Sequence, residues 1–341
     1  MFSRLRSLGG LLAALAAVAM VGAGSAPARG ADLVKVTFAQ PVTYVGAAPV
    51  YAALKFGYFK DEGLDVDLVT IAGTAPMFAG VESGSAQFGI TNGLSLLTGV
   101  AKGLPFVAFV GTDHGFSILN MVASASWAKA HNMSLKDDYR ATLRKLVGAR
   151  IGLLGTTSTG GLLLSAVAKQ MGLPDDAFQM VAMGPPASLA ALSNGSIDAY
   201  FQGIPPTGGV YVLNSGQFPG IQKVAGNVVF TTADYINKHA DIVAKMARAI
   251  ARGANAALDP EVQPRVLQAI SERIPEFSIP ELKGELLRPG VPVGNGQLIP
   301  ASFTLANQYD AQIGLLDKPL TADQVNGAFT MKFVPKNYIK P

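Results

Sequence analysis

The sequence predicts an α/β protein with two similar units and a helical C-terminal segment. Residues 58–91 and 169–203 both carry a Gly-Leu pair and then a Gly-Ser pair, whose glycines are 21 and 23 positions apart. Glycine just past a helix end turns the backbone left-handed at low cost, so matched glycines indicate matched helix ends. Short apolar runs also alternate with helical patterns, which is typical of mainly parallel sheets flanked by helices. Two such units predict two lobes with a cleft between them.

The first unit starts with an alternating, β-branched run at 34–39, which predicts a strand. A loop follows, and Pro49 stands near the first position of a helix expected over 50–60. The other elements expected in this unit are strand 65–71, helix 76–83, strand 88–91, helix 94–102 and strand 106–111. This order of strand, loop and helix is that of an α/β unit.

The second unit follows a crossing at 112–116 and begins with a strand within 117–124. Ser134, with Asp137 three residues later, predicts a capped helix over 134–147. The elements expected next are strand 150–154, loop 155–161, helix 162–171, strand 178–183, helix 187–193 and strand 198–201.

The C-terminal segment opens with a long helical pattern over 233–258 and continues with short helices separated by Pro and Gly. We expect this helical tail to pack on the first lobe. The expected domains are residues 32–113 with 230–341 as lobe 1, and residues 114–229 as lobe 2.

Residues 1–28 predict a secretory signal peptide. Arg4 and Arg6 precede the uncharged run 11–23, and Ala26-Pro27-Ala28 has the small-x-small form of a cleavage site. The apolar run is shorter than the roughly 20 residues that span a hydrocarbon layer. We therefore expect an exported, periplasmic protein.

Composition excludes several classes of protein. The chain has 341 residues, of which 49% are hydrophobic and 15% charged, so a disordered chain is excluded. Its net charge of +4 falls to +2 without Arg4 and Arg6, so a nucleic-acid partner is not indicated. There is no cysteine, which excludes disulfides, thiol catalysis, thiolate metal sites and the lipid anchor of a lipoprotein.

The strongest candidate site is the hydroxyl-rich loop 155–161 between a strand and a helix. Its candidate ligand-binding residues are Thr156, Thr157, Ser158, Thr159 and Gly160. A helix N-terminus exposes unpaired N–H groups, and hydroxyls with small glycines let an anion approach. The alternative is that Thr157 or Ser158 only caps the helix. A nucleotide P-loop is excluded because Gly161 and Leu162, rather than Lys and Ser/Thr, follow Gly160.

Other strand-end loops are expected to face the same cleft, because ligands of open parallel sheets bind beyond the carboxyl ends of the strands. The candidates are Tyr44, Thr74 and Asn92 in the first lobe, Phe116 at the crossing, and Gly184 and Gln202 in the second lobe. Tyr44 could instead serve packing alone, and each loop taken singly is an ordinary turn.

Signals for catalysis or metal binding are weak. The three histidines lack metal-ligand spacing, and no acidic cluster has the spacing of a metal loop. Asp113-His114 is the one candidate acid/base pair, but a hydrogen bond from this crossing to the backbone is the favoured alternative. We expect no enzyme activity, no cofactor and no metal.

Three stretches, 55–69, 82–91 and 148–173, with support from 191–201, resemble periplasmic substrate-binding proteins of the NMT1/THI5-like group of ABC importers. That group includes binding proteins for aliphatic sulfonates, taurine and nitrate. The resemblance covers roughly residues 34–230. It implies a two-lobe, type II-like periplasmic-binding fold that closes by hinge motion around a small ligand.

The resemblance also implies a function. It places ligand contacts at the hydroxyl loop 156–160 and near Tyr44, Thr74 and Asn92, and it implies a monomer that delivers a small organic anion to an ABC permease. These loops contain no Arg or Lys, so neutral donors would hold the anion, or the ligand is less charged. An aromatic or pyrimidine ligand, an exported enzyme and a sensor on the same scaffold stay open as alternatives. The branch that makes the thiamine pyrimidine is disfavoured, because it needs a cysteine-rich signature.

Overall fold

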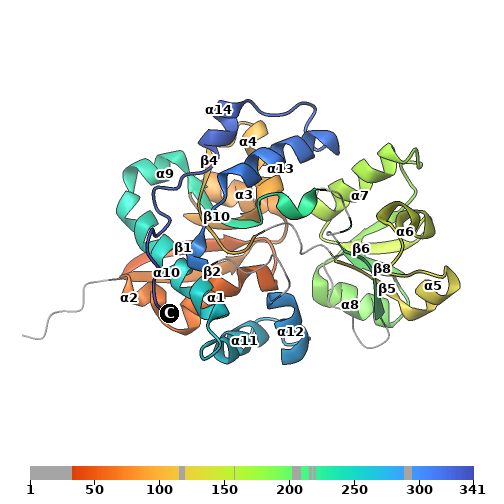
Figure 1. The fold of residues 1–341 in the computed structure, drawn as a ribbon, viewed down its shortest axis with the longest axis horizontal. Helices are drawn as coiled ribbons and strands as arrows, with labels where there is room; N and C mark the ends of the chain where they lie inside the picture. The colour runs from red at the N-terminus through yellow and green to blue at the C-terminus, as the bar shows by residue number, and fades with distance from the viewer. Residues whose placement is uncertain are drawn as a thin grey trace, which may run out of the picture. The chain divides into compact units, whose positions relative to one another are not determined.

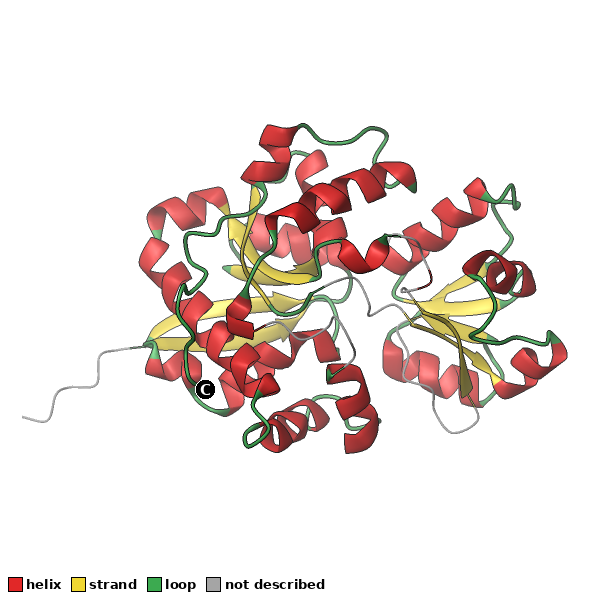
Figure 2. Cartoon of the chain, in the orientation of Figure 1, coloured by secondary structure: helices red, strands yellow, loops and turns green. Residues whose placement is uncertain are grey.

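Two five-stranded sheets flanked by helices make up the described part of the chain (Figures 1 and 2). The computed structural model describes residues 33–114, 120–156, 158–201, 209–214, 217, 220–287 and 294–341. Within it, Val34–Pro341 form one unit. The predicted signal peptide lies outside the described residues.

The first sheet has the strand order β2-β1-β3-β10-β4. Its strands are β1 (Val34–Gln40), β2 (Leu64–Thr70), β3 (Phe88–Asn92), β4 (Phe106–Gly111) and β10 (Asn227–Thr232). Strand β1 pairs in parallel with β2 and β3, whereas β10 is antiparallel to β3 and β4.

The second sheet repeats this arrangement with the order β7-β6-β8-β5-β9. Its strands are β5 (Asn120–Ser124), β6 (Arg150–Leu153), β7 (Gln179–Ala182), β8 (Ala199–Phe201) and β9 (Gly209–Asn214). Strand β6 is parallel to β7 and β8, and β5 is antiparallel to β8 and β9. In each sheet the antiparallel strand directly follows a crossing from the other sheet, so the sequence repeat corresponds to a repeat of topology.

The glycines of the sequence repeat adopt the conformation that the repeat predicts. Gly63 and Gly84 have φ of 77° and 78°, and Gly172 and Gly195 have φ of 67° and 78°. All four follow a helix and lie in the left-handed region that disfavours side chains with a Cβ. The expected correspondence of helix ends is confirmed.

Helices connect the strands in both sheets. Those of the first part are η1 (Val45–Ala47), α1 (Ala48–Lys55), α2 (Tyr58–Asp61), α3 (Thr74–Glu82) and α4 (Gly93–Ala101). Those of the second part are α5 (Ala125–Ala130), α6 (Tyr139–Lys145), α7 (Thr159–Gln170), α8 (Pro185–Ser193) and η3 (Ile221–Lys223).

The C-terminal segment is helical and packs on the first sheet's helices, as expected. It contains α9 (Ala233–Lys238), α10 (Ala240–Leu258), α11 (Gln263–Ser271), α12 (Ile279–Leu286), η4 (Gly294–Gly296), α13 (Pro300–Gln312) and α14 (Ala322–Gly327). Helix α10 is in close contact with α1: a Cβ on Gly253 would lie 2.0 Å from the carbonyl oxygen of Pro49. Side chains of α1, α10, α11 and α12 share one core with β1 and β3.

Three expected helices differ from the structure. The helical pattern over 233–258 divides at His239, whose φ of −135° is not helical, into α9 and α10. The helix expected over 50–60 divides into α1 and α2, because Gly57 has a φ of 80° and interrupts it. The helix expected from Ser134 starts at Tyr139. Asp138, not Ser134, is its N-cap and accepts from the N–H groups of Arg140 and Ala141 at 2.8 and 3.0 Å. Helix α5 and strand β9 are not predicted by the sequence patterns.

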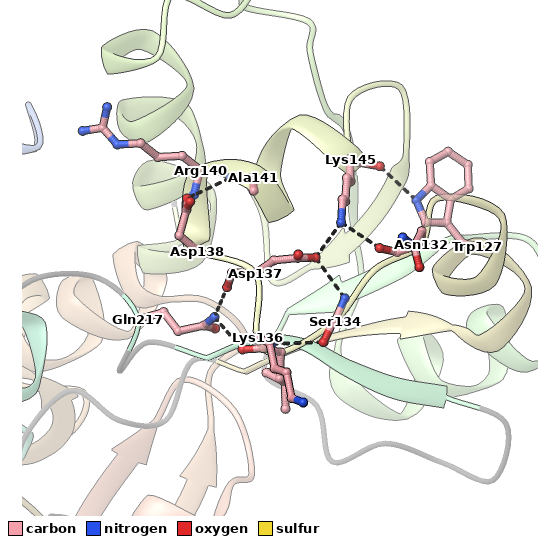
Figure 3. Close-up of polar contacts among 11 residues, drawn as sticks. Trp127, Asn132, Ser134, Lys136, Asp137, Asp138, Arg140, Ala141, Lys145 and Gln217 are labelled. Carbon is pink, nitrogen blue, oxygen red and sulfur yellow. Dashed lines mark hydrogen bonds and ion pairs between the residues drawn. The ribbon is translucent and has the colours of Figure 1, made fainter.

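Ser134 belongs instead to a polar cluster around Lys145 that orders the connection between α5 and α6 (Figure 3). The Lys145 ammonium donates to the carbonyl oxygen of Asn132 and to Asp137 Oδ2, both at 2.7 Å. Asp137 Oδ2 also accepts from the Ser134 N–H at 3.0 Å. These bonds to a charged group hold the segment as a turn rather than a helix.

No helix within the described ranges combines the length and the apolar character needed to cross a membrane.

Candidate functional site

Tyr44, a predicted ligand-binding residue, lies in a hydrogen-bonded chain that links the first loop to strand β10. Its hydroxyl donates to Asn227 Oδ1 at 3.0 Å. The Asn227 amide donates to Asp113 Oδ2 at 2.6 Å, and the Asn227 N–H donates to Asp113 Oδ1. Asn227 also pairs with Asn92 across β10 and β3. No sequence pattern singles out Asn227 as a site residue.

Asp113 is a buried carboxyl whose two oxygens are both used by Asn227. Burial raises the pKa of Asp113 to about 7, while the two hydrogen bonds from Asn227 act to lower it. The surrounding backbone is close: a Cβ on Gly226 would lie 2.3 Å from Asp113 Oδ1. Burial also lowers the pKa of the neighbouring His114. Asp113 is thus bound to the backbone at the crossing, which is the reading favoured from the sequence.

Asn92 and Thr159 meet where the N-termini of α4 and α7 approach each other. Asn92 caps α4 by accepting from the Ser95 N–H at 2.9 Å, and its amide donates to Thr159 Oγ1 at 3.2 Å. The Ser95 and Thr159 hydroxyls are 2.8 Å apart. Two of the predicted residues, Asn92 at the end of β3 and Thr159 at the start of α7, are therefore in direct contact, and Ser95 of α4 also contacts Thr159.

The hydroxyl-rich loop contains both the N-cap of α7 and an exposed side chain. Ser158 is the N-cap of α7: its Oγ accepts from the Gly161 N–H at 3.3 Å and donates to the Gly155 carbonyl at 2.6 Å. Gly160 is buried, and a Cβ there would lie 3.0 Å from the Phe201 ring. Thr156 is exposed. Ser158 and Thr159 thus have protein partners, whereas the Thr156 side chain is exposed to solvent.

A cavity of about 750 Å³ lies beside strand ends from both sheets. Its lining from the first sheet is Pro41, Val42, Thr43, Thr70, Ala72 and Gly73, and from the second sheet Leu154, Ala182, Met183, Gly184, Pro185 and Pro186. The turn between α11 and α12 completes it with Arg273, Pro275 and Glu276. This volume is within the range of small-molecule sites, roughly 300–1,000 Å³.

Arg273 gives the cavity a positive charge that the loops lack. Its guanidinium carbon lies 5.6 Å from the centre of the Tyr51 ring. None of the ion pairs among the described residues includes Arg273, and only Glu276 carries the opposite charge in the lining. Burial raises the pKa of Tyr51 to about 12, and Arg273 acts to lower it.

The predicted residues are distributed as follows. Gly184 lines the cavity, and Thr74 follows the lining residue Gly73 at the start of α3. Tyr44, Asn92, Thr156, Ser158, Thr159 and Gly160 are not among its lining residues. Phe116, Thr157 and Gln202 lie outside the described residues. Within the described ranges, no group of three or more acidic, His or Cys side chains could hold a metal ion.

A protein-family model described as NMT1/THI5 like matches residues 45–262. None of the curated proteins matches the chain in sequence.

Solved structures with the same fold are similar over most of the chain. A protein from Bordetella bronchiseptica has a TM-score of 0.72 at 18% identity, over 89% of this chain and 96% of that one. The periplasmic nitrate-binding protein NrtA from Synechocystis has a TM-score of 0.68 at 13% identity, over 89% and 87%. The alkanesulfonate-binding protein SsuA from Xanthomonas axonopodis, bound to MOPS, has 0.66 at 12%, over 88% and 99%. These likenesses confirm the periplasmic-binding fold.

Proposed function

The chain belongs to the NMT1/THI5-like family, and on that premise we propose that it is the extracytoplasmic solute-binding component of an ABC importer. It captures a small organic anion, such as a sulfonate or carboxylate, and delivers it to a membrane permease. The names of two relatives with this fold, an alkanesulfonate-binding and a nitrate-binding protein, support an anionic ligand.

The observation that carries this proposal is the 750 Å³ cavity lined by strand ends of both sheets and by Arg273. Ligands of open α/β sheets bind beyond the carboxyl ends of the strands. An aliphatic lining with few polar groups suits the apolar part of an organic anion. Thr74, Gly184 and the exposed Thr156 are the further contacts that we propose for the ligand.

Binding without catalysis is the function that the side chains favour. Asp113, half of the one candidate acid/base pair, uses both carboxylate oxygens on Asn227. A general base must reach the proton that it removes, and this carboxylate is buried. We therefore propose a binding protein rather than an enzyme.

We further propose that residues 1–28 direct export to the periplasm. The proposed lobes are residues 32–113 with 230–341, and residues 114–229. They would close over the ligand by motion at the two crossings that connect the sheets. A monomer suits docking to a permease.

The test is isothermal titration calorimetry of the purified mature protein against hexanesulfonate, taurine, hexanoate, benzoate, nitrate and a hydroxymethylpyrimidine. We expect micromolar binding of at least one sulfonate or carboxylate, equivalent to about −8 kcal/mol. Binding of the pyrimidine alone would favour the aromatic-ligand alternative. Binding of none of these anions would refute the proposal of an organic-anion carrier.

A further inference from the structure

We propose that the anionic group of the ligand is bound by Arg273 together with the hydroxyl groups of Thr43 and Thr70, and that the buried Tyr51–Gln40 pair orients these hydroxyls. The inference rests on the proposed binding function and identifies the residues that recognise the ligand's charge. Arg273 lies beyond residues 45–262, which the family model matches.

The orientation begins at a backbone group whose role is fixed. The Tyr44 N–H can only donate, and it lies 3.3 Å from the Tyr51 hydroxyl oxygen, which therefore accepts. The Tyr51 hydroxyl hydrogen is then directed to Gln40 Oε1, which is 2.8 Å away. Because the amide atom that accepts this bond must be the oxygen, the bond fixes the orientation of the Gln40 amide.

The Gln40 amide passes this orientation on to the cavity wall. Its Nε2 points to Thr70 Oγ1 at 3.0 Å and to Thr43 Oγ1 at 3.4 Å, and donates to both. Gln40 is only 2% exposed, so water does not compete for its amide. A hydroxyl that accepts from Gln40 keeps its own hydrogen for another acceptor. Among the described residues neither threonine hydroxyl has an acceptor, and both threonines line the cavity.

Arg273 adds charge to these two donors. A guanidinium offers several N–H groups in a planar fork that fits a carboxylate or sulfonate. The Arg273 guanidinium lies over the ring of Tyr51, the residue whose hydroxyl donates to Gln40. The combination of two O–H donors and one guanidinium is specific for an acceptor with negative charge.

Glu276 restricts which anions fit. It is the one acidic residue in the lining, and none of the ion pairs among the described residues joins it to Arg273. A second negative group on the ligand would be repelled there, whereas a hydroxyl or amine would be accepted.

The experiment compares Arg273→Gln with Arg265→Gln by calorimetry against hexanesulfonate, hexanoate and benzoate. Arg265 is a matched control, because it is also exposed on the same segment and stacks on an aromatic ring, Phe56, at 4.6 Å, but does not line the cavity. We expect Arg273→Gln to weaken binding of the bound anion about 10- to 100-fold and Arg265→Gln to leave it within about twofold. Unchanged melting temperatures would verify that both variants fold.

A second pair of variants tests the hydroxyl donors. Thr70→Val keeps the shape but removes the O–H, and we expect about fivefold weaker binding, whereas Thr70→Ser restores the donor and the affinity. Wild-type affinity in both Arg273→Gln and Thr70→Val would overturn this inference and leave the proposed function intact. Failure of the wild type to bind any of these anions would overturn both.

Discussion

Asp113 is a single buried carboxyl that makes the stability of the protein depend on pH. Its pKa of about 7 in the folded protein lies above the ordinary value near 4, because burial disfavours the charged form. The folded state therefore holds a proton that the unfolded state loses at lower pH. The stabilisation from Asp113 is complete below about pH 4 and is lost as the pH rises to about 7, a change on the order of 4 kcal/mol.

We predict that Asp113→Asn reduces this fall in the free energy of unfolding between pH 5 and pH 7.5. Urea denaturation at the two pH values measures it. Asp137→Asn is the control, because the bond from Lys145 lowers the pKa of Asp137, so its stabilisation is lost only below about pH 4 and the slope between pH 5 and pH 7.5 should not change. The buried Asp310, whose pKa is also raised by burial, leaves a residual slope in every variant. An unchanged slope in Asp113→Asn would contradict the assignment.

The residues at the N-terminus of helix α7 have several different roles. Ser158 caps the helix, Thr159 contacts Asn92 at the end of β3 and Ser95 in α4, and Thr156 is exposed. The sequence left open whether the loop binds a ligand or only caps the helix. The cap is present at Ser158, and the contact with α4 could not be predicted, because it depends on how two distant segments meet.

We predict that Ser158→Ala lowers the free energy of unfolding by about 1 kcal/mol, the usual cost of losing an N-cap. Because its hydroxyl is occupied by Gly155 and Gly161, affinity for the anion should change less than about twofold. Chemical denaturation and calorimetry measure the two effects, with Ser158→Thr as a variant that keeps the cap. A tenfold loss of affinity in Ser158→Ala would place the anion at this loop instead of at Arg273.

At the scale of the whole molecule, the repeat predicted most of the fold because its glycines mark helix ends. Gly63 and Gly172 have the left-handed backbone that the pattern requires. Strands came from alternating apolar runs, which report directly on burial. Helix-end glycines and alternating apolar runs are visible in the sequence because they depend on residues that are close together in the chain.

The charged part of the candidate site could not be predicted in this way. Arg273 lies in the turn between α11 and α12, more than 200 positions after Thr43 and Thr70 in the chain. No local sequence pattern distinguishes it from other surface arginines. The expectation that neutral donors alone hold the anion was based on the strand-end loops. It could not include a residue that the tail brings to the cavity.

The central claim is that the protein carries a small organic anion, and native mass spectrometry of protein purified from a periplasmic extract tests it most directly. We predict a noncovalent adduct that denaturation releases, with the mass of a small monoanionic acid, present in the wild type and in Arg265→Gln and much reduced in Arg273→Gln. An adduct that is neutral or cationic, or a wild-type protein that neither carries an adduct nor acquires one from the sulfonates and carboxylates, would contradict the claim.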